Sequence, residues 1–336
     1  MKAVICAKPF QLGIVDYPAP QPAEGEILVR IRRIGLCGTD YHIFSGRHPF
    51  LVYPRVMGHE LAGEVESAPP GSSFRRGQQV AINPYLPCGA CIACRKGKPN
   101  ACANVQVLGV HIDGGMCELL AVPEQAVLDA TGLTLDQAAM LEFLAIGAHA
   151  VARARLRPGD RVLVLGAGPI GIATGLFARQ DGAVVTLADM RQTRLDYARA
   201  QLGFDDVVAV DAELAAALAR RTRGEMFDAV FDATGSLESM GQSLTHVCHG
   251  GTLVFVGVAP GDLVLSDPEF HKRETTLLAS RNARTEDFER VIAAMRAGQI
   301  PSEALQTHGF PAEELPERIP QLIADADHVL KAIASF

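Results

Sequence analysis

The sequence predicts an α/β protein in which a β-rich region precedes a doubly wound, six-stranded parallel sheet. Residues 1–145 are rich in Gly and Pro and hold only short apolar runs such as 27–31, a texture typical of irregular β structure with many turns. From residue 161 on, six continuous apolar runs alternate mostly with helical patterns, as strands buried on both faces of a sheet require. A glycine-rich turn follows the first of these runs.

The elements of the second region follow one another closely. The expected strands are the apolar runs 161–165, 183–188, 207–210, 227–232, 252–257 and 276–279. The expected helices are 169–180, 191–201, 212–222 and 239–248. After residue 284 the periodicity indicates two amphipathic segments, 285–297 and 312–324, and a short strand before Phe336.

Composition bounds the class of protein. A chain of 336 residues is long enough for about two domains, and 48% hydrophobic with 21% charged residues is typical of globular proteins. The net charge of −7 disfavours nucleic acid as the main partner. No stretch approaches the roughly 20 apolar residues of a membrane span, and the first residues lack the apolar segment of a signal peptide. We therefore expect a cytoplasmic protein without a membrane partner.

Four of the eight cysteines form a compact pattern, Cys88-x2-Cys91-x2-Cys94-x7-Cys102. In a chain of this length, such spacing favours metal binding in a reducing compartment over a disulfide scaffold. Four thiolates can close a tetrahedral zinc site and leave no position open for chemistry. The pattern predicts a structural zinc.

The glycine-rich turn predicts a dinucleotide site. In Gly166-x-Gly168-Pro169-Ile170-Gly171, the first glycine makes the tight turn and the second lets backbone amides approach a pyrophosphate. The third glycine lets helix and strand pack closely, and proline at the first helical position sacrifices no hydrogen bond. The pattern follows an apolar strand and opens a helix, which is the context that supports it.

The end of the second strand indicates which cofactor binds. Asp189 stands where a carboxylate accepts hydrogen bonds from the adenosine ribose and repels a 2′-phosphate, so NAD is expected rather than NADP. Arg191 and Arg194 follow and could soften this preference, and Arg194 is a further candidate cofactor contact. Val256 and Val258 lie at the carboxyl end of a later strand, the edge where ligands bind.

Several motifs occur in the order of the zinc-dependent medium-chain alcohol and polyol dehydrogenases, which the chain resembles nearly end to end. They are GLCGTDYH at 35–42, GHE at 58–60, the four-cysteine run, GAGPIG at 166–171 and the closing residues 331–336. The resemblance implies a GroES-like catalytic domain, 1–147 and 284–336, around an NAD-binding Rossmann domain, 148–283. It implies two zinc ions per subunit, and we expect a homodimer or homotetramer.

A second zinc, the catalytic one, would lie at Cys37 and His59, a thiolate and an imidazole suited to this ion. The third protein ligand is either Glu60 or Glu142, with the other carboxylate holding a bound water or taking its place as substrate enters. Glu142 stands where simple alcohol dehydrogenases carry a cysteine and where the chain resembles polyol dehydrogenases. The polyol pattern usually continues with proline, whereas this chain has Phe143.

The resemblance assigns roles to further residues. Asp40 matches the carboxylate that orients the ligating histidine. Thr39 and His42 match a proton relay, in which Thr39 passes on the proton of the substrate hydroxyl and His42 delivers it to water. Lys331 falls where relatives carry a basic residue near the pyrophosphate, and the nicotinamide is expected near Val256 and Val258.

The substrate is indicated by segments 53–56, 108–115, 266–274 and 280–283, which resemble the sugar-acid branch, in particular L-galactonate and L-gulonate 5-dehydrogenases. Arg281 and Asn282 stand where sorbitol dehydrogenases carry an arginine–aromatic pair near the polyol. Arg281 or Lys272 is suited to a carboxylate. We expect oxidation of a hexonate at C5. The alternatives are a polyol, diol or threonine dehydrogenase, and, more remotely, a cofactor-binding protein without turnover.

Overall fold

The computed structural model describes residues 1–47 and 51–336, which form two compact units. Unit 1 comprises Met1–Phe143 and Arg284–Phe336, and unit 2 comprises Leu144–Ala283. The chain leaves unit 1 inside helix α4 (Leu141–Ala154), slightly before the expected boundary at 147, and returns at the expected residue 284.

Unit 1 is built on a seven-stranded sheet of order β10-β6-β5-β3-β18-β17, with β9 also paired to β3. A three-stranded sheet, β2-β1-β4, and the pair β7-β8 complete it. Its strands are β1 (Lys2–Lys8), β2 (Gln11–Asp16), β3 (Glu26–Leu36), β4 (Arg55–Val56), β5 (Glu60–Ser67), β6 (Gln79–Ile82), β7 (Tyr85–Leu86), β8 (Gln106–Val107), β9 (Leu119–Pro123), β10 (Val127–Asp129), β17 (Gln306–Pro311) and β18 (Lys331–Ser335).

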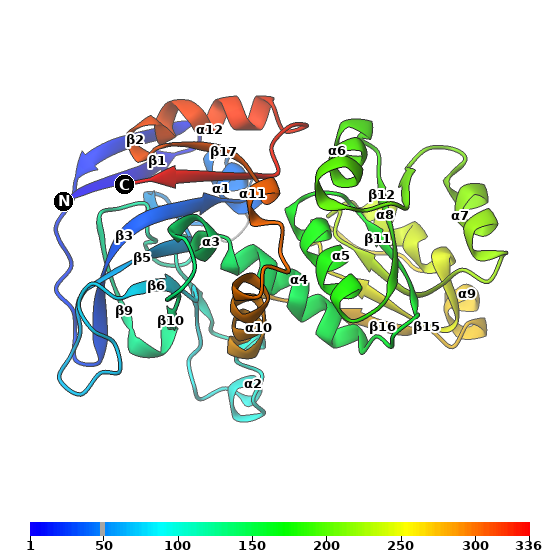
Figure 1. Cartoon of the computed structure of the whole chain (residues 1–336), viewed down its shortest axis with the longest axis horizontal. Helices are drawn as coiled ribbons and strands as arrows, with labels where there is room; N and C mark the ends of the chain where they lie inside the picture. Colours follow the sequence, from blue (N-terminus) through cyan, green and yellow to red (C-terminus); the bar gives the residue numbers. More distant parts are fainter. Residues whose placement is uncertain (48–50) are drawn as a thin grey trace. The chain divides into compact units, whose positions relative to one another are not determined.

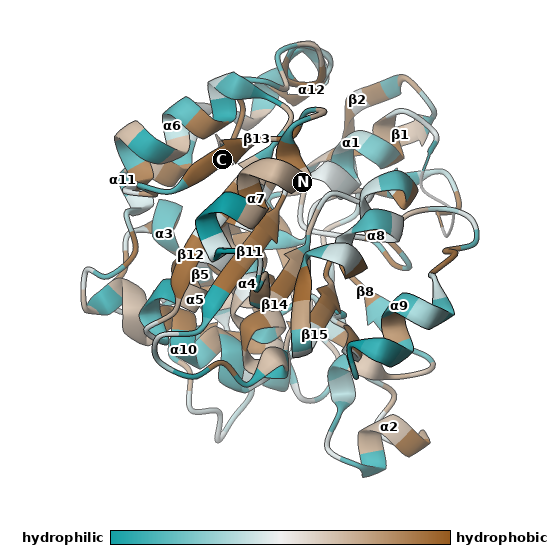
Figure 2. Ribbon diagram, turned by 90° about the vertical axis from the view of Figure 1, so that its right-hand side faces the viewer, coloured by the Kyte–Doolittle hydropathy of each residue, from teal (hydrophilic) through white to brown (hydrophobic). Residues whose placement is uncertain are grey.

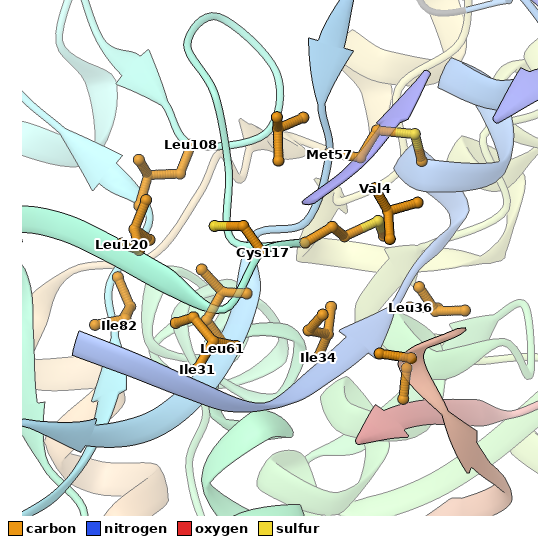
Figure 3. Close-up of a cluster of buried hydrophobic side chains, with 14 of the residues drawn as sticks. Val4, Ile31, Ile34, Leu36, Met57, Leu61, Ile82, Leu108, Cys117 and Leu120 are labelled. Atoms are coloured by element: carbon orange, nitrogen blue, oxygen red, sulfur yellow. The ribbon is translucent and has the colours of Figure 1, made fainter. Parts of the chain in front are cut away.

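The helices of unit 1 are short or lie near the chain end. They are α1 (Gly38–Phe44), α2 (Ile92–Arg95), α3 (Leu135–Ala139), α10 (Thr285–Arg296), α11 (Ser302–Leu305) and α12 (Leu315–Ala324). Strand β3 has the alternating burial of a half-buried strand, since Ile27, Val29 and Ile31 are buried and the residues between them are partly exposed. Ile31, Ile34 and Leu61 converge with side chains of other strands in a continuous apolar core (Figure 3).

Strand β18 links the end of the chain to this sheet. It pairs antiparallel with β3, with Ala332 opposite Leu36, and parallel with β17 (Figure 1). The amino end of β18 is Lys331. The expected short strand before Phe336 is thus present, and it is an internal strand of the sheet.

Unit 2 is the expected parallel sheet, of order β13-β12-β11-β14-β15-β16, with every pairing parallel. The strands are β11 (Arg161–Leu165), β12 (Val184–Asp189), β13 (Val207–Ala209), β14 (Phe227–Asp232), β15 (Val247–Phe255) and β16 (Thr276–Ala279). The helices are α5 (Pro169–Gln180), α6 (Gln192–Leu202), α7 (Leu214–Thr222), α8 (Leu237–Ser243) and α9 (Asp267–Lys272). Its strands are largely hydrophobic (Figure 2), because helices cover both faces of such a sheet.

One expected element is wrong in its bounds. The helix expected over 239–248 ends at Ser243, and β15 already begins at Val247. The pairing of β15 with β14 shifts between Val247 and Thr252, and Gly250 and Gly251 lie in this irregularity. The two glycines interrupt the apolar run, so the sequence reveals only the second half of the strand. No helix in the described part of the chain is long and apolar enough to cross a membrane.

Candidate active site

The four-cysteine lobe of unit 1 brings its thiols together as expected. Cys102 Sγ lies 3.4 Å from Cys88 Sγ and 3.8 Å from Cys91 Sγ, and Cys91 Sγ lies 3.5 Å from Cys94 Sγ. These separations are too long for disulfides. They match the edges of a tetrahedron of sulfurs around an ion at about 2.3 Å, which are ~3.8 Å. The arrangement therefore fits a structural zinc.

Backbone N–H groups support these thiols. Cys88 N and Asn104 N donate to Cys102 Sγ over 3.3 and 3.4 Å. Donation from the N–H groups of Cys94 and Ala103 lowers the pKa of Cys91 to about 6. Hydrogen bonds to sulfur favour the thiolate, the form that binds metal.

A second group of metal-ligating side chains lies in the same unit, and we call it the cluster: Cys37, His59, Glu60 and Glu142. Cys37 follows β3 and caps α1, His59 directly precedes β5, Glu60 opens that strand, and Glu142 lies in the first turn of α4. Cys37 Sγ is 3.0 Å from His59 Nε2. Ligand atoms of His59, Glu60 and Glu142 lie within 4.8 Å of one another, as do those of Cys37, Asp40 and His59.

Two buried polar atoms without hydrogen bonds, one on His59 and one on the neighbouring Asp40, are consistent with a metal at the cluster. His59 Nδ1 and Asp40 Oδ1 are 4.0 Å apart, and neither makes a hydrogen bond with any described residue. Burial alone would lower the pKa of His59, but the Cys37 thiolate and the Asp40 carboxylate raise it well above its usual value. A cation bound at Nε2 would fix the tautomer that directs Nδ1–H at Asp40.

Each carboxylate of the cluster has a partner. Lys331 Nζ lies 2.7 and 2.6 Å from the two oxygens of Glu60, and both side chains have 0% exposure. The Tyr85 phenol donates to Glu142 Oε1. Burial and then the Glu142 charge raise the pKa of Tyr85 well above its usual value, so the phenol stays a donor. Burial also raises the pKa of Glu142.

The position of Lys331 differs from the expected one near a pyrophosphate. Its ammonium is buried in unit 1 and also donates to the Leu36 carbonyl over 3.0 Å. With three donors engaged and no exposed surface, it has nothing left for a phosphate. The structure therefore replaces the predicted cofactor contact with an ion pair to Glu60.

The expected relay residues share helix α1. Thr39 N donates to Cys37 Sγ over 3.2 Å, which places Thr39 beside the cluster. His42 lies one turn further along and is exposed. Partial burial, followed by the charge of Arg47, lowers the pKa of His42. A path from the cluster to solvent along one helix is what a proton relay needs.

The glycine-rich turn of unit 2 has the expected geometry. Gly166 has φ +100°, which only glycine adopts readily, and Gly168 caps α5. A Cβ on Gly171 would lie 1.7 Å from the Gly166 carbonyl oxygen, so helix and strand approach too closely for any side chain. Pro169 and Ile170 form the first helical positions, whose N–H groups have no intrahelical acceptor.

Asp189 ends β12 beside this turn. Its oxygens accept hydrogen bonds from Ala167 N over 2.6 Å and Arg191 N over 2.8 Å. The guanidinium of Arg194 lies 3.3 Å from where a Cβ on Gly168 would be. Both side chains thus border the turn expected to hold a pyrophosphate.

Other expected residues of unit 2 lie at the carboxyl ends of its strands. Val256 directly follows β15 and is buried, whereas Val258 is 87% exposed. Arg281 and Asn282 follow β16, with Asn282 at φ +53°. These four residues therefore share the ligand-binding edge of the sheet.

Lys272, the other residue predicted to contact the substrate, lies away from that edge. It ends α9, before the amino end of β16, and pairs with Glu269 over 2.8 Å. The next residue, Arg273, donates to the Val247 carbonyl at the amino end of β15. Lys272 thus belongs to the opposite edge of the sheet from Arg281.

The sequence alone does not indicate that Tyr85 is part of the site. The one feature of the sequence that could have indicated Tyr85 is its position three residues before Cys88. This short spacing places Tyr85 on the segment that leads into the four-cysteine lobe. The contact with Glu142 depends on how β7 and α4 meet, and no local pattern encodes that.

Comparisons with known proteins cover both units. Residues 23–132 match the alcohol dehydrogenase GroES-like domain, and residues 169–297 match the zinc-binding dehydrogenase family. The chain is 41% identical to L-galactonate-5-dehydrogenase of Escherichia coli K12, over 100% of this chain and 99% of that one. It is 31% identical to 2-dehydro-3-deoxy-L-galactonate 5-dehydrogenase of Pseudoalteromonas atlantica, over 86% of this chain and 85% of the relative.

A solved structure agrees over the whole chain. The crystal structure of an alcohol dehydrogenase from Escherichia coli CFT073 in complex with NADH has a TM-score of 0.94 and 30% identity, and the match covers 100% of this chain and 99% of the other.

Proposed function

The chain belongs to the zinc-dependent alcohol and polyol dehydrogenases, and on this premise we propose that it oxidises a secondary hydroxyl of a sugar acid to the ketone with NAD. The observation that carries the chemistry is the cluster, in which the His59 imidazole lies within metal-ligand distance of the Cys37 sulfur and also of the Glu60 and Glu142 carboxylates. Such an oxygen-rich set suits zinc that binds a polyhydroxylated substrate. Names of two relatives, both acting at C5 of galactonate-type acids, support the sugar acid.

Zinc at Cys37 and His59 would supply a Lewis acid that lowers the pKa of the substrate hydroxyl. The residues of the chain do the rest. Thr39 accepts the hydroxyl proton and His42 passes it to water. Bound NAD⁺ would supply the hydride acceptor, C4 of the nicotinamide, so that each hydroxyl oxidised to a ketone would reduce one NAD⁺ and release one proton.

Unit 2 supports the proposal that the hydride acceptor is NAD. A carboxylate at Asp189 accepts bonds from ribose hydroxyls and repels a 2′-phosphate. Asp189→Ala should therefore lower kcat/KM with NAD and raise kcat/KM with NADP. Steady-state kinetics with each cofactor measures both changes. Equal kcat/KM for both in the unmutated protein would remove this assignment.

The sugar-acid proposal is tested by pairing each aldonate with its alditol. L-Gulonate or L-galactonate should exceed the neutral polyol by roughly ten- to a hundredfold in kcat/KM, because one charged contact contributes about 1.5–3 kcal/mol. Arg281→Met should abolish this difference, because a guanidinium is suited to a carboxylate. Lys272→Met is the matched control and should leave the difference intact, since Lys272 lies at the other edge of the sheet. A polyol that is as good a substrate would make this a general polyol dehydrogenase.

A further inference from the structure

We propose that Lys331 is a positioning residue of the metal site, which keeps the Glu60 carboxylate off the metal and leaves Glu142 as the oxygen ligand. This rests on the proposed function, because it requires zinc at Cys37 and His59. A catalytic zinc needs three protein ligands and an open position. If both Glu60 and Glu142 joined Cys37 and His59, the site would be closed.

The pairing engages Glu60 on both sides. Lys331 Nζ lies 2.7 Å from Oε1 and 2.6 Å from Oε2, and its third donor reaches the Leu36 carbonyl over 3.0 Å. Neither side chain is exposed, so water does not compete for these bonds. Releasing Glu60 to a metal would leave the ammonium buried and unpaired, which is strongly unfavourable.

Gly35 makes this pairing possible. The strands lie in the order β5-β3-β18, with Glu60 opposite Gly35 and Ala332 opposite Leu36. The Glu60 side chain crosses β3 at Gly35, where a Cβ would lie 2.2 Å from Oε2. The missing side chain therefore gives the carboxylate a route toward β18.

Phe143 holds the cation from another side. Its ring centroid lies 4.3 Å from Lys331 Nζ, a distance at which an aromatic face attracts an ammonium. Phe143 stands where the polyol pattern usually has proline. The phenylalanine that replaces this proline is therefore the residue whose ring contacts the buried Lys331 ammonium.

Glu142 is held more loosely than Glu60. The Tyr85 phenol donates to Oε1, and a carboxylate offers about four acceptor positions on its two oxygens. Glu142 can accept this bond and still present oxygen to a metal. The Lys331 ammonium binds both oxygens of Glu60, whereas the Tyr85 phenol binds one oxygen of Glu142. Glu142 is therefore the carboxylate that can become the ligand.

The test uses three variants: Lys331→Met, the double variant Lys331→Met/Glu60→Gln, and Glu142→Gln. Lys331→Met frees a charged Glu60 to become a fourth ligand. Zinc should then leave to a chelator more slowly, and turnover should fall roughly ten- to a hundredfold. The double variant has no such carboxylate and no unpaired charge, so its zinc release should match the unmutated protein and its turnover should exceed that of Lys331→Met. Glu142→Gln should release zinc faster.

Cobalt substitution gives a readout independent of turnover. The visible absorption of Co²⁺ at the cluster should change in Lys331→Met and in Glu142→Gln and return to the unmutated spectrum in the double variant. If Lys331→Met does not fold, the double variant and Glu142→Gln still decide the ligand.

Three results would overturn the proposal. They are faster zinc release from the double variant than from Glu142→Gln, an unchanged cobalt spectrum in Lys331→Met, and weaker NADH binding in Lys331→Met with metal release unaffected. The last result would instead support the expected contact between Lys331 and the pyrophosphate of the cofactor. Failure of the proposed function is a separate outcome: the unmutated protein would hold no zinc at the cluster or would form no NADH.

Discussion

The lobe and the cluster are both suited to zinc, but their supports differ. The lobe takes its ligands from Cys88 to Cys102, and backbone N–H groups donate to their sulfurs. The cluster takes its ligands from three separate segments. A backbone N–H donates to Cys37, but side chains hold the two carboxylates, Lys331 at Glu60 and Tyr85 at Glu142, and Asp40 lies 4.0 Å from His59. Where backbone N–H groups support the ligands, the metal affinity of the site should change little when neighbouring side chains are substituted. A site supported by side chains can be tuned, and also broken, one residue at a time.

The largest effect should come from Cys37→Ser. Loss of the thiolate should reduce turnover about a thousandfold (~4 kcal/mol), because it removes a ligand of the ion that activates the substrate. Zinc content should fall from two to one per chain while the circular dichroism spectrum stays the same. Full activity in this variant would show that the cluster is not the reaction centre.

Cys91→Ser should act on stability. The lobe has little apolar core, so metal binding holds its fold. We expect Tm to fall by about 5 °C or more, which is ~2 kcal/mol for a unit of this size, with one zinc lost. Calorimetry and metal analysis measure both. If two zinc ions remain after the substitution, the structural site lies elsewhere.

Tyr85→Phe should have a smaller effect that separates the two sites. Removing the phenol leaves Glu142 without this donor, and kcat should fall about tenfold, as for other residues that orient a ligand. The lobe should keep its zinc. Tyr17→Phe is the control, because its hydroxyl donates to Asp113 over 2.8 Å in the same unit, outside the cluster. Equal activity of both variants would mean that Tyr85 does not position Glu142.

Asn104→Ala should have the smallest effect. Its side-chain nitrogen is 4.0 Å from Cys88 Sγ, whereas its backbone N–H donates to Cys102 and is retained in alanine. Stability should change by less than about 0.5 kcal/mol, with zinc content unaffected. A loss comparable to that of Cys91→Ser would contradict the view that backbone supports the lobe.

The same contrast explains what the sequence predicted. The lobe and the Gly166–Gly171 turn are local patterns, and the parallel sheet follows from apolar runs of strand length. Lys331 was misplaced because its contact depends on the register of β18 and β5 on either side of β3. The position of Lys272 also differs from the expected edge of the sheet, because the sequence does not reveal that α9 leads into the amino end of β16. Contacts made by distant segments follow from register, which the sequence does not display.

Strand β18 has a consequence for synthesis on the ribosome. Chains are made from the amino terminus at about 5–20 residues per second, and domains generally fold as units. Unit 2 is continuous and can fold while the second part of unit 1, from Arg284 on, is still being made. Unit 1 is discontinuous, and its sheet lacks β18 and the Lys331 charge until residues 331–335 have been made. A chain released before Lys331 is made therefore carries both zinc motifs and the whole glycine-rich turn, yet has an uncompensated carboxylate at Glu60.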